Sequence, residues 1–254
     1  MKSLLVAASI AMLCGATAHA ADLGRPYLKA APVEQVYSWT GFYVGGNVGY
    51  GETRSPSVVQ GSTITFGTVD FSGSGNLAAT GVVGGGQIGY NWQSSPNWLF
   101  GVEADIQGTD QKATLTATIP LLGPPTPFVS GESRLKYFGT VRGRVGYLFT
   151  PSTVIYVTGG LAYGETELNL SKDFGFFGGS ASSAAFRDTK TGFTAGGGIE
   201  TKLWGNWSAK AEYLYLDLRS MSGLINDIPA QESASARVAF RDHIVRAGLN
   251  YKLY

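Results

Sequence analysis

Few side chains of this 254-residue chain have the type and spacing that catalysis or metal binding requires. Residues 84–89, Gly-Gly-Gly-Gln-Ile-Gly, have the G-x-G-x-x-G spacing of a dinucleotide-binding loop, but a strand-like Tyr90-Asn91-Trp92 follows where that loop needs a helix. His243 has Asp242 beside it, but no nucleophile motif accompanies the pair. One imidazole cannot build a metal site, and no acidic cluster has the spacing of a calcium loop. We therefore expect no enzyme activity, no cofactor and no metal.

The composition indicates a β-rich chain without a nucleic-acid partner. Charged residues make up 15%, well below the roughly 25% of soluble domains. Hydrophobic residues reach 44%, which excludes a charge-rich disordered chain, and the 36 glycines have no collagen period. A formal net charge of +1 offers no basic excess for nucleic acid. Beyond the N-terminus, no apolar run reaches the roughly 18 residues of a membrane-spanning helix.

The N-terminus has the features of a cleavable export signal. Lys2 precedes an apolar stretch over 4–16, and residues 18–20, Ala-His-Ala, match an A-x-A cleavage site. We expect residues 1–20 to be removed as a signal peptide and residues 21–38 to form a flexible periplasmic segment before a barrel over 39–254. Cleavage removes Cys14, the one cysteine, so the mature chain can form no disulfide.

Eight stretches of about ten residues alternate apolar with polar or small residues, which is the period-2 pattern of a β-strand. These stretches are 42–50, 82–93, 98–107, 134–149, 155–164, 193–203, 207–215 and 245–253. Three short turns, near 94–97, 150–152 and 205–206, alternate with four long polar segments, near 53–79, 109–132, 168–190 and 218–236. The arrangement predicts an all-β fold: an eight-stranded antiparallel up-and-down transmembrane β-barrel with three short periplasmic turns and four long extracellular loops.

Period-2 alternation also fits a soluble up-and-down barrel whose apolar face points inward. The charges on the minor face favour the lipid-facing alternative, because they have both signs, as an interior network of ion pairs requires. The predicted lumen charge network consists of Glu103, Asp105, Arg134, Lys136, Arg142, Arg144, Glu200, Lys202, Lys210, Glu212 and Arg246, with Lys252 on the same face. The interior of eight strands is just wide enough to be filled by side chains, so we expect little path for solutes.

The aromatic residues gather near the strand ends, where a membrane barrel has interfacial girdles. Five tryptophans lie next to a short turn or just before the first strand and predict a periplasmic girdle: Trp39, Trp92, Trp98, Trp204 and Trp207. Trp204 does not have the outward parity of the others, so it is expected near the turn rather than facing lipid. A second girdle is expected from Tyr50, Tyr137, Tyr163 and Tyr215.

The C-terminal strand, Arg246 to Leu253, looks like the signal by which the outer-membrane assembly machinery recognises barrel precursors. Its elements are Gly248, Tyr251 and Leu253, although Leu253 replaces the usual final aromatic residue and Tyr254 follows it. The same pattern also fits an amphipathic last strand without a signalling role.

Three segments resemble one known family. Residues 39–50 (Trp-Thr-Gly-Phe-Tyr-Val-Gly-Gly-Asn-Val-Gly-Tyr) are similar to the first strand of the small alphaproteobacterial outer-membrane immunogenic proteins, which are grouped with porin-family and opacity-type barrels. Residues 158–164 and 210–215 are similar to internal strands of these proteins. The resemblance implies an outer-membrane, eight-stranded barrel. Roles attached to the family include envelope integrity, surface antigenicity, pore formation and, in some members, haemin binding.

We therefore expect a non-enzymatic protein with a structural, surface-exposed role in the cell outer membrane. One alternative is a small diffusion channel. Another is a surface receptor for haemin or a host molecule, which could stack on the aromatic segment 174–177 unless those rings dip into the membrane interface. The expected partners are outer-membrane lipids and the barrel assembly machinery, and the sequence leaves the oligomeric state open.

Overall fold

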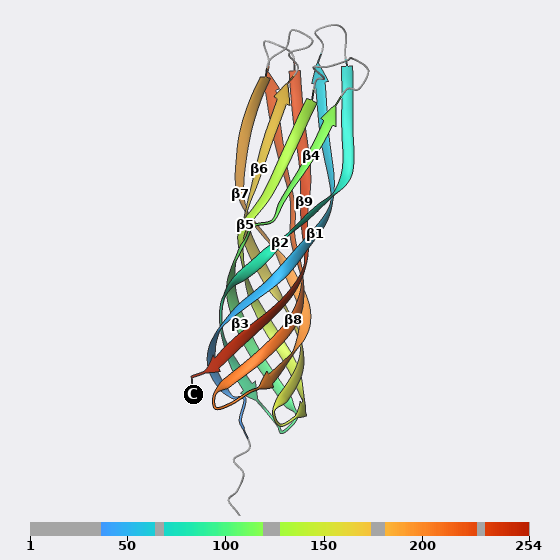
Figure 1. Cartoon of the computed structure of the whole chain (residues 1–254). Helices are drawn as coiled ribbons and strands as arrows, with labels where there is room; N and C mark the ends of the chain where they lie inside the picture. The colour runs from blue at the N-terminus through green and yellow to red at the C-terminus, as the bar shows by residue number, and fades with distance from the viewer. Residues whose placement is uncertain (1–36, 64–68, 119–127, 174–180, 228–231, 254) are drawn as a thin grey trace, which may run out of the picture. The chain divides into compact units, whose positions relative to one another are not determined.

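The computed structural model describes residues 37–63, 69–118, 128–173, 181–227 and 232–253, which form antiparallel strands joined by short turns (Figure 1). The strands are β1 (Gly41–Thr63), β2 (Val69–Gln93), β3 (Trp98–Thr109), β4 (Lys112–Thr118), β5 (Phe128–Thr150), β6 (Thr153–Asp173), β7 (Ala181–Lys202), β8 (Trp207–Asp227) and β9 (Glu232–Lys252). None of the described residues belongs to a helix able to cross a membrane.

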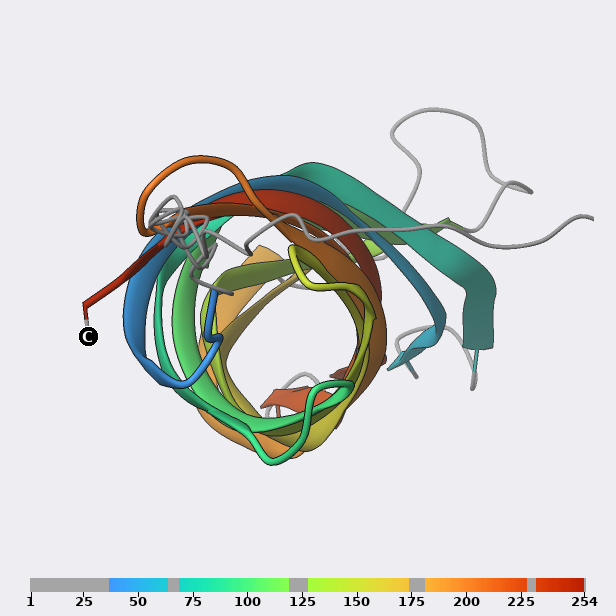
Figure 2. The same cartoon turned by 90° about the horizontal axis from the view of Figure 1, so that it is seen from below.

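The strands close into a ring, seen from below in Figure 2. β1 pairs with β9 as well as with β2, and β3 pairs with both β2 and β5. β3 and β4 are two parts of one barrel strand, because both pair with β5 and only Asp110 and Gln111 separate them. The eight strand positions and the all-β fold are confirmed.

The strands are much longer than the sequence predicts. The segments expected to be long loops, near 53–79, 109–132, 168–190 and 218–236, mostly continue the strands in the described residues, so that β1 and β5 each have 23 residues. Polar residues in these segments suggested loops, but a strand that faces water carries polar side chains on its outer face and still pairs its backbone.

Polar and charged side chains at one height of the barrel divide its outer surface into two parts. We call it the outer charged ring; it consists of Glu52, Lys136, Glu165, Asp217 and His243. Tyr50, Tyr163 and Tyr215 each precede an acid of this ring by two residues. Between the ring and the short turns, the outward residues are mostly apolar or small, over segments such as 42–50 and 207–215. That span is close to the roughly 9–11 residues with which a tilted strand crosses a bilayer. We call this part the membrane half and the part beyond the ring the distal half.

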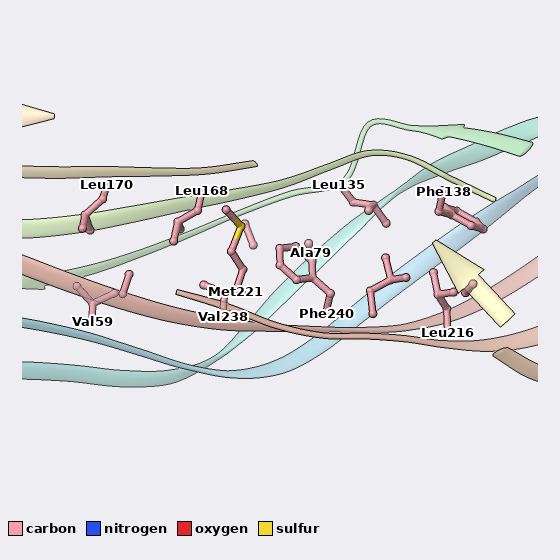
Figure 3. Packing of buried hydrophobic residues seen from close by; sticks show 14 of the residues in the cluster. Val59, Ala79, Leu135, Phe138, Leu168, Leu170, Leu216, Met221, Val238 and Phe240 are labelled. Atoms are coloured by element: carbon pink, nitrogen blue, oxygen red, sulfur yellow. The ribbon is translucent and has the colours of Figure 1, made fainter. Parts of the chain in front are cut away.

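The distal half has the opposite polarity, with an apolar interior. Two ladders of the ring stop before the distal half: the β7–β8 ladder ends at Phe193↔Asp217, and the β2–β3 ladder ends at Val83↔Thr109. The distal strands therefore form two sheets, one of β2, β1, β9 and β8 and the other of β7, β6, β5 and β4. Figure 3 shows Leu168 and Leu170 of one side across from Val59 and Val238 of the other. The distal half is therefore built like a two-sheet sandwich around a core.

Irregularities in β5 and β8 lie close to the outer charged ring. The β5–β6 register shifts between Leu135 and Tyr137, and the β8–β9 register shifts between Asp217 and Ser220, next to Arg219 with a φ of 67°. An extra residue reverses which side chains face inward. Leu135 is consequently buried in the distal core, although the alternation places it on the same outward face as Val141.

Candidate functional site: the charged interior of the membrane half

The interior of the membrane half contains four acids and four bases, each almost fully buried. These are Glu103 and Asp105 on β3, Arg142 and Arg144 on β5, Glu200 on β7, Lys210 and Glu212 on β8, and Arg246 on β9. Their neighbours along the strands, such as Val102, Val141 and Val245, face outward and are exposed. Strand alternation therefore places the charges inside, and the structure brings together these eight residues of the predicted network.

Arg142 and Arg246 share three carboxylates at the centre of this network. Arg142 donates hydrogen bonds to Asp105 (3.0 Å) and Glu212 (3.0 Å), and it also pairs with Glu103. Arg246 donates to Glu212 through Nε (2.7 Å) and to Asp105 through Nη2 (2.8 Å). Because these residues come from β3, β5, β8 and β9, the network connects strands from several sides of the ring.

Lys210 and Arg144 extend the network. Lys210 Nζ lies 2.9 and 3.0 Å from the two carboxylate oxygens of Glu103. Arg144 donates to Glu200 at 2.8 Å, and its guanidinium lies 4.3 Å from the ring centroid of Tyr156. Arg144 is thereby held by a charged and an aromatic partner at once.

The network is electrically balanced, which is what makes its burial tolerable. Removing one partner from a buried ion pair leaves an uncompensated charge at a cost of about 3–5 kcal/mol. Equal numbers of acids and bases, each within reach of an opposite charge, avoid that cost. The described residues contain no group of three or more His, Cys, Asp and Glu side chains that could hold a metal ion. The arrangement can fill and brace the lumen.

Uncharged partners of the network were missed by the sequence reasoning. Tyr43 donates to Glu103 at 2.7 Å, Tyr156 donates to Glu212 at 3.1 Å, and Asn250 donates to Glu200 at 2.8 Å. All three lie at inward positions of their strands. The alternation could have found the two tyrosines, because their parity matches that of polar residues rather than that of the lipid-facing aromatics.

Trp39 closes the end of the interior next to the short turns. It is 2% exposed and packs against Leu99, Leu148 and Val154, and its indole N–H donates to the carbonyl oxygen of Pro151 at 3.2 Å. The prediction that Trp39 belongs to a lipid-facing girdle is therefore wrong. Trp39 precedes β1, so strand alternation does not fix its direction, and the chain turns it into the barrel mouth.

Tyr37 and two lysines complete this closure. Lys202 Nζ and Lys252 Nζ lie 4.4 and 4.9 Å from the ring centroid of Tyr37, and Lys252 also donates to the carbonyl oxygen of Ser38. The sequence predicts Lys202 to be part of the lumen charge network, and that prediction is wrong. In the structure Lys202 is a cation–π partner of Tyr37 at the mouth of the barrel. It stands at the last position of β7 and is half-buried.

The other end of the network is covered by apolar side chains. Phe138, Leu214 and Ile244 are buried at the inward positions beyond it and belong to the distal core. Interior cavities near Trp39 and near Gln111 have volumes of about 10 Å³ each, room for a single water. The lumen is thus packed with side chains both at the ionic network and in the apolar region beyond it.

Arg134 and Lys136 are not in the lumen, contrary to the prediction. Lys136 points outward, its side chain is 43% exposed, and it pairs with Glu167 at 2.9 Å. Arg134 pairs with Glu132 at 2.7 Å on the outer face of β5. The bulge after Leu135 is the reason, because it changes the side on which these residues lie. The hydrogen bond from Lys136 and the charge of Arg187 lower the pKa of Glu167.

The other four tryptophans are exposed near the short turns. Trp92, Trp98 and Trp207 face outward next to other rings, for example Trp207 against Tyr251 at a centroid distance of 5.1 Å. Trp204 lies in the turn between β7 and β8 and is 67% exposed.

The predicted assembly signal lies on the last strand. Gly248 faces inward, while Tyr251 and Leu253, the apolar elements of this signal, are partly exposed.

The two motifs that suggested chemistry are strand features. His243 is exposed, and its Nδ1 shares a hydrogen bond with the Tyr213 hydroxyl at 2.7 Å. Asp242 is buried on the opposite face of β9. The pair therefore cannot act together on one substrate. Residues 84–89 lie within β2 and pair with both β1 and β3. The predicted signal peptide and the aromatic segment 174–177 lie outside the described residues.

These features define a transmembrane β-barrel: a closed antiparallel sheet, apolar outside and ionic inside over the height of a bilayer. The outer membrane protein beta-barrel domain family matches residues 6–252. The chain belongs to this family, and it is an outer-membrane protein.

Named relatives agree with this assignment. The chain is 38% identical to the 31 kDa outer-membrane immunogenic protein of Brucella melitensis, over 99% of this chain and 100% of the relative. It is 28% identical to the 25 kDa outer-membrane immunogenic protein of Brucella abortus, over 99% and 98% of the two chains. Among solved structures, the outer membrane protein OprG from Pseudomonas aeruginosa has 12% identity and a TM-score of 0.46, over 85% of this chain and 99% of that one. The expected resemblance to small alphaproteobacterial outer-membrane immunogenic proteins is confirmed.

Proposed function

We propose that this protein is a non-conducting, non-enzymatic barrel that anchors a rigid structure at the cell surface. The observation that carries the proposal is the filled interior: a balanced ionic network between the aromatic closure at Trp39 and the apolar core of the distal half. The membrane half serves as the anchor. The distal half extends outside the membrane and forms the exposed part of the protein.

The packed lumen argues against the diffusion-channel alternative. Ions would have to pass Arg142 and Arg246, which are each held by more than one carboxylate, and then the side chains of Phe138 and Leu214. Opening that route would require breaking several buried ion pairs together. The relatives named above are described as immunogenic, which supports a surface-exposed role.

Single-channel recording of the purified protein in planar bilayers tests the proposal. We expect no steady conductance from the intact protein. A double variant, Arg142→Ala with Arg246→Ala, leaves three carboxylates with fewer cations and should show unstable, cation-favouring current. Reproducible conductance steps from the unaltered protein would contradict the proposed function.

We further propose that outer-membrane lipids and the barrel assembly machinery are its partners. Tyr251 and Leu253 lie on the outward side of the last strand, and Leu253 N donates to the carbonyl oxygen of Phe42 where β9 meets β1. The backbone edge of this strand is paired with β1 only when the ring is complete, so a recognition signal there is accessible before closure. Leu253→Asp should lower the yield of folded barrel in cells, while refolding of the purified variant in detergent should be nearly unchanged.

A further inference from the structure

The outer face of the distal half has a hollow across β1, β9 and β8. Its volume is about 460 Å³, and it is lined by Val58 and Gln60 of β1, Ser222 and Leu224 of β8, and Ser235 and Arg237 of β9. The strand registers place these residues in two adjacent rows, because Val58 and Ser222 both pair with Arg237, and Gln60 and Leu224 both pair with Ser235. The hollow is therefore a continuous feature of three hydrogen-bonded strands.

The side chains of this hollow differ from the rest of the distal surface. Leu224 is 54% exposed and Val58 is 39% exposed, so two large apolar side chains are open to the surface beyond the outer charged ring. Arg237 lies between them and is exposed. No ion pair of Arg237 is found within the described part of the chain, whereas Arg241 on the same strand pairs with Asp217 at 3.3 Å.

Two occupants are disfavoured by the geometry. Acyl chains do not reach the hollow, because it lies beyond the ring that ends the lipid-facing surface. A second copy docked by a two-fold axis would bring two Arg237 side chains together, and like charges oppose such an interface.

We propose that the hollow is the docking site of a different protein, one that presents an apolar side chain beside a carboxylate. The apolar group would cover Val58 and Leu224, and the carboxylate would pair with Arg237. Protein–protein contacts combine an apolar centre with a polar rim, and arginine is enriched among their anchoring residues. Gln60, Ser222 and Ser235 supply that polar surround. The proposal requires only that the distal half lies outside the membrane and does not depend on the lumen being closed.

Site-specific photo-crosslinking in intact cells tests this proposal. A photoreactive residue replaces Ser222 in the hollow, and a matched control replaces Thr114, which is exposed on β4 in the other sheet. We expect a protein adduct from position 222 but not from position 114. Mass spectrometry of the adduct should place an Asp or Glu next to an apolar residue at the crosslinked site of the partner.

Charge reversal at Arg237 separates a specific contact from chance proximity. Arg237→Glu should lower the adduct yield about tenfold, whereas Arg237→Lys should preserve most of it. Heat-modifiable migration on gels checks that each variant still folds, and Arg237→Gln replaces the glutamate variant if that one does not fold. Absence of an adduct, equal yields at both positions, insensitivity to the charge at 237, or adducts made only of lipid or of a second copy would each overturn the proposal.

Discussion

Val141 and Arg142 are consecutive residues of β5 that face opposite environments. Val141 is 57% exposed on the outer surface, whereas Arg142 is 2% exposed inside, in contact with Glu103, Asp105 and Glu212. A shift of one residue in the strand would exchange the two, placing an arginine in lipid and a valine among carboxylates. Paired substitutions at these positions therefore test the orientation of the whole barrel.

Val141→Arg should destabilise the barrel by about 2–4 kcal/mol, because it places a charge against acyl chains near the middle of the membrane half. Urea unfolding of the protein refolded into liposomes measures the change, with Val141→Leu as the control of similar polarity. A variant as stable as the unaltered protein would mean that Val141 does not face lipid.

Arg142→Ala should destabilise the barrel by about 3–5 kcal/mol, since it removes the cation shared by three buried carboxylates. Adding Glu212→Gln to this variant should recover part of the loss by removing one unmatched charge. The same unfolding experiment applies. If the two substitutions proved additive, the coupling of these side chains in one network would be refuted.

Gly159→Ala and Gly160→Ala should differ strongly although the residues are adjacent in β6. A Cβ at Gly160 would lie 2.7 Å from Arg142 Cα, too close to the facing backbone of β5. A Cβ at Gly159 would have Thr194 O, at 3.6 Å, as its nearest neighbour. We expect Gly160→Ala to cost about 1–3 kcal/mol and Gly159→Ala to be neutral or slightly stabilising. Equal effects would contradict the inward assignment of Gly160.

Acidic pH should stabilise the protein through Asp242. This carboxyl is buried just beyond the outer charged ring and accepts hydrogen bonds from Thr53 and Gln111. Burial raises its pKa from the usual 3.8 to about 6, and the two hydrogen bonds offset only part of that effect. The folded protein therefore holds the proton more tightly than the unfolded chain does, and the free energy of unfolding falls as the pH rises through this window.

The expected loss between about pH 4 and about pH 7 is of order 2–3 kcal/mol. Asp242→Asn should remove this dependence and be the more stable form at neutral pH. Unfolding curves of both proteins across this range provide the measurement. Parallel pH profiles for the two would show that Asp242 is not the group responsible.

Single cysteines should report which end of the barrel lies outside the cell, because the one natural cysteine, Cys14, lies in the predicted signal peptide. Thr114→Cys on the distal half should react with a membrane-impermeant maleimide on intact cells. Ser152→Cys, in the turn between β5 and β6, should react only after the outer membrane is permeabilised. The reverse pattern would invert the proposed orientation.

Much of the membrane half could be predicted from the sequence. A strand in lipid must carry apolar residues on its outer face, so the alternation around Val141, Val157 and Val245 indicates both the strands and the direction of Arg142, Thr158 and Arg246. The short turns were equally readable from their Pro, Gly and Asn residues. The strands of the distal half could not be predicted, because Ser, Thr and Gly residues that face water occur in loops and in exposed strands alike.

The tertiary structure alone decided which groups meet. Alternation assigns a side chain to a face but says nothing about its height in the barrel, so the contacts of Arg246 with Asp105 and Glu212 follow from the registers of the paired strands. Alternation also assigns the wrong face where a strand contains an extra residue, and it assigns none to a residue that precedes the first strand. The bulge after Leu135 puts Lys136 outside, and Trp39, ahead of the first strand, turns inward to close the mouth, because local sequence pattern carries no information about either change of direction.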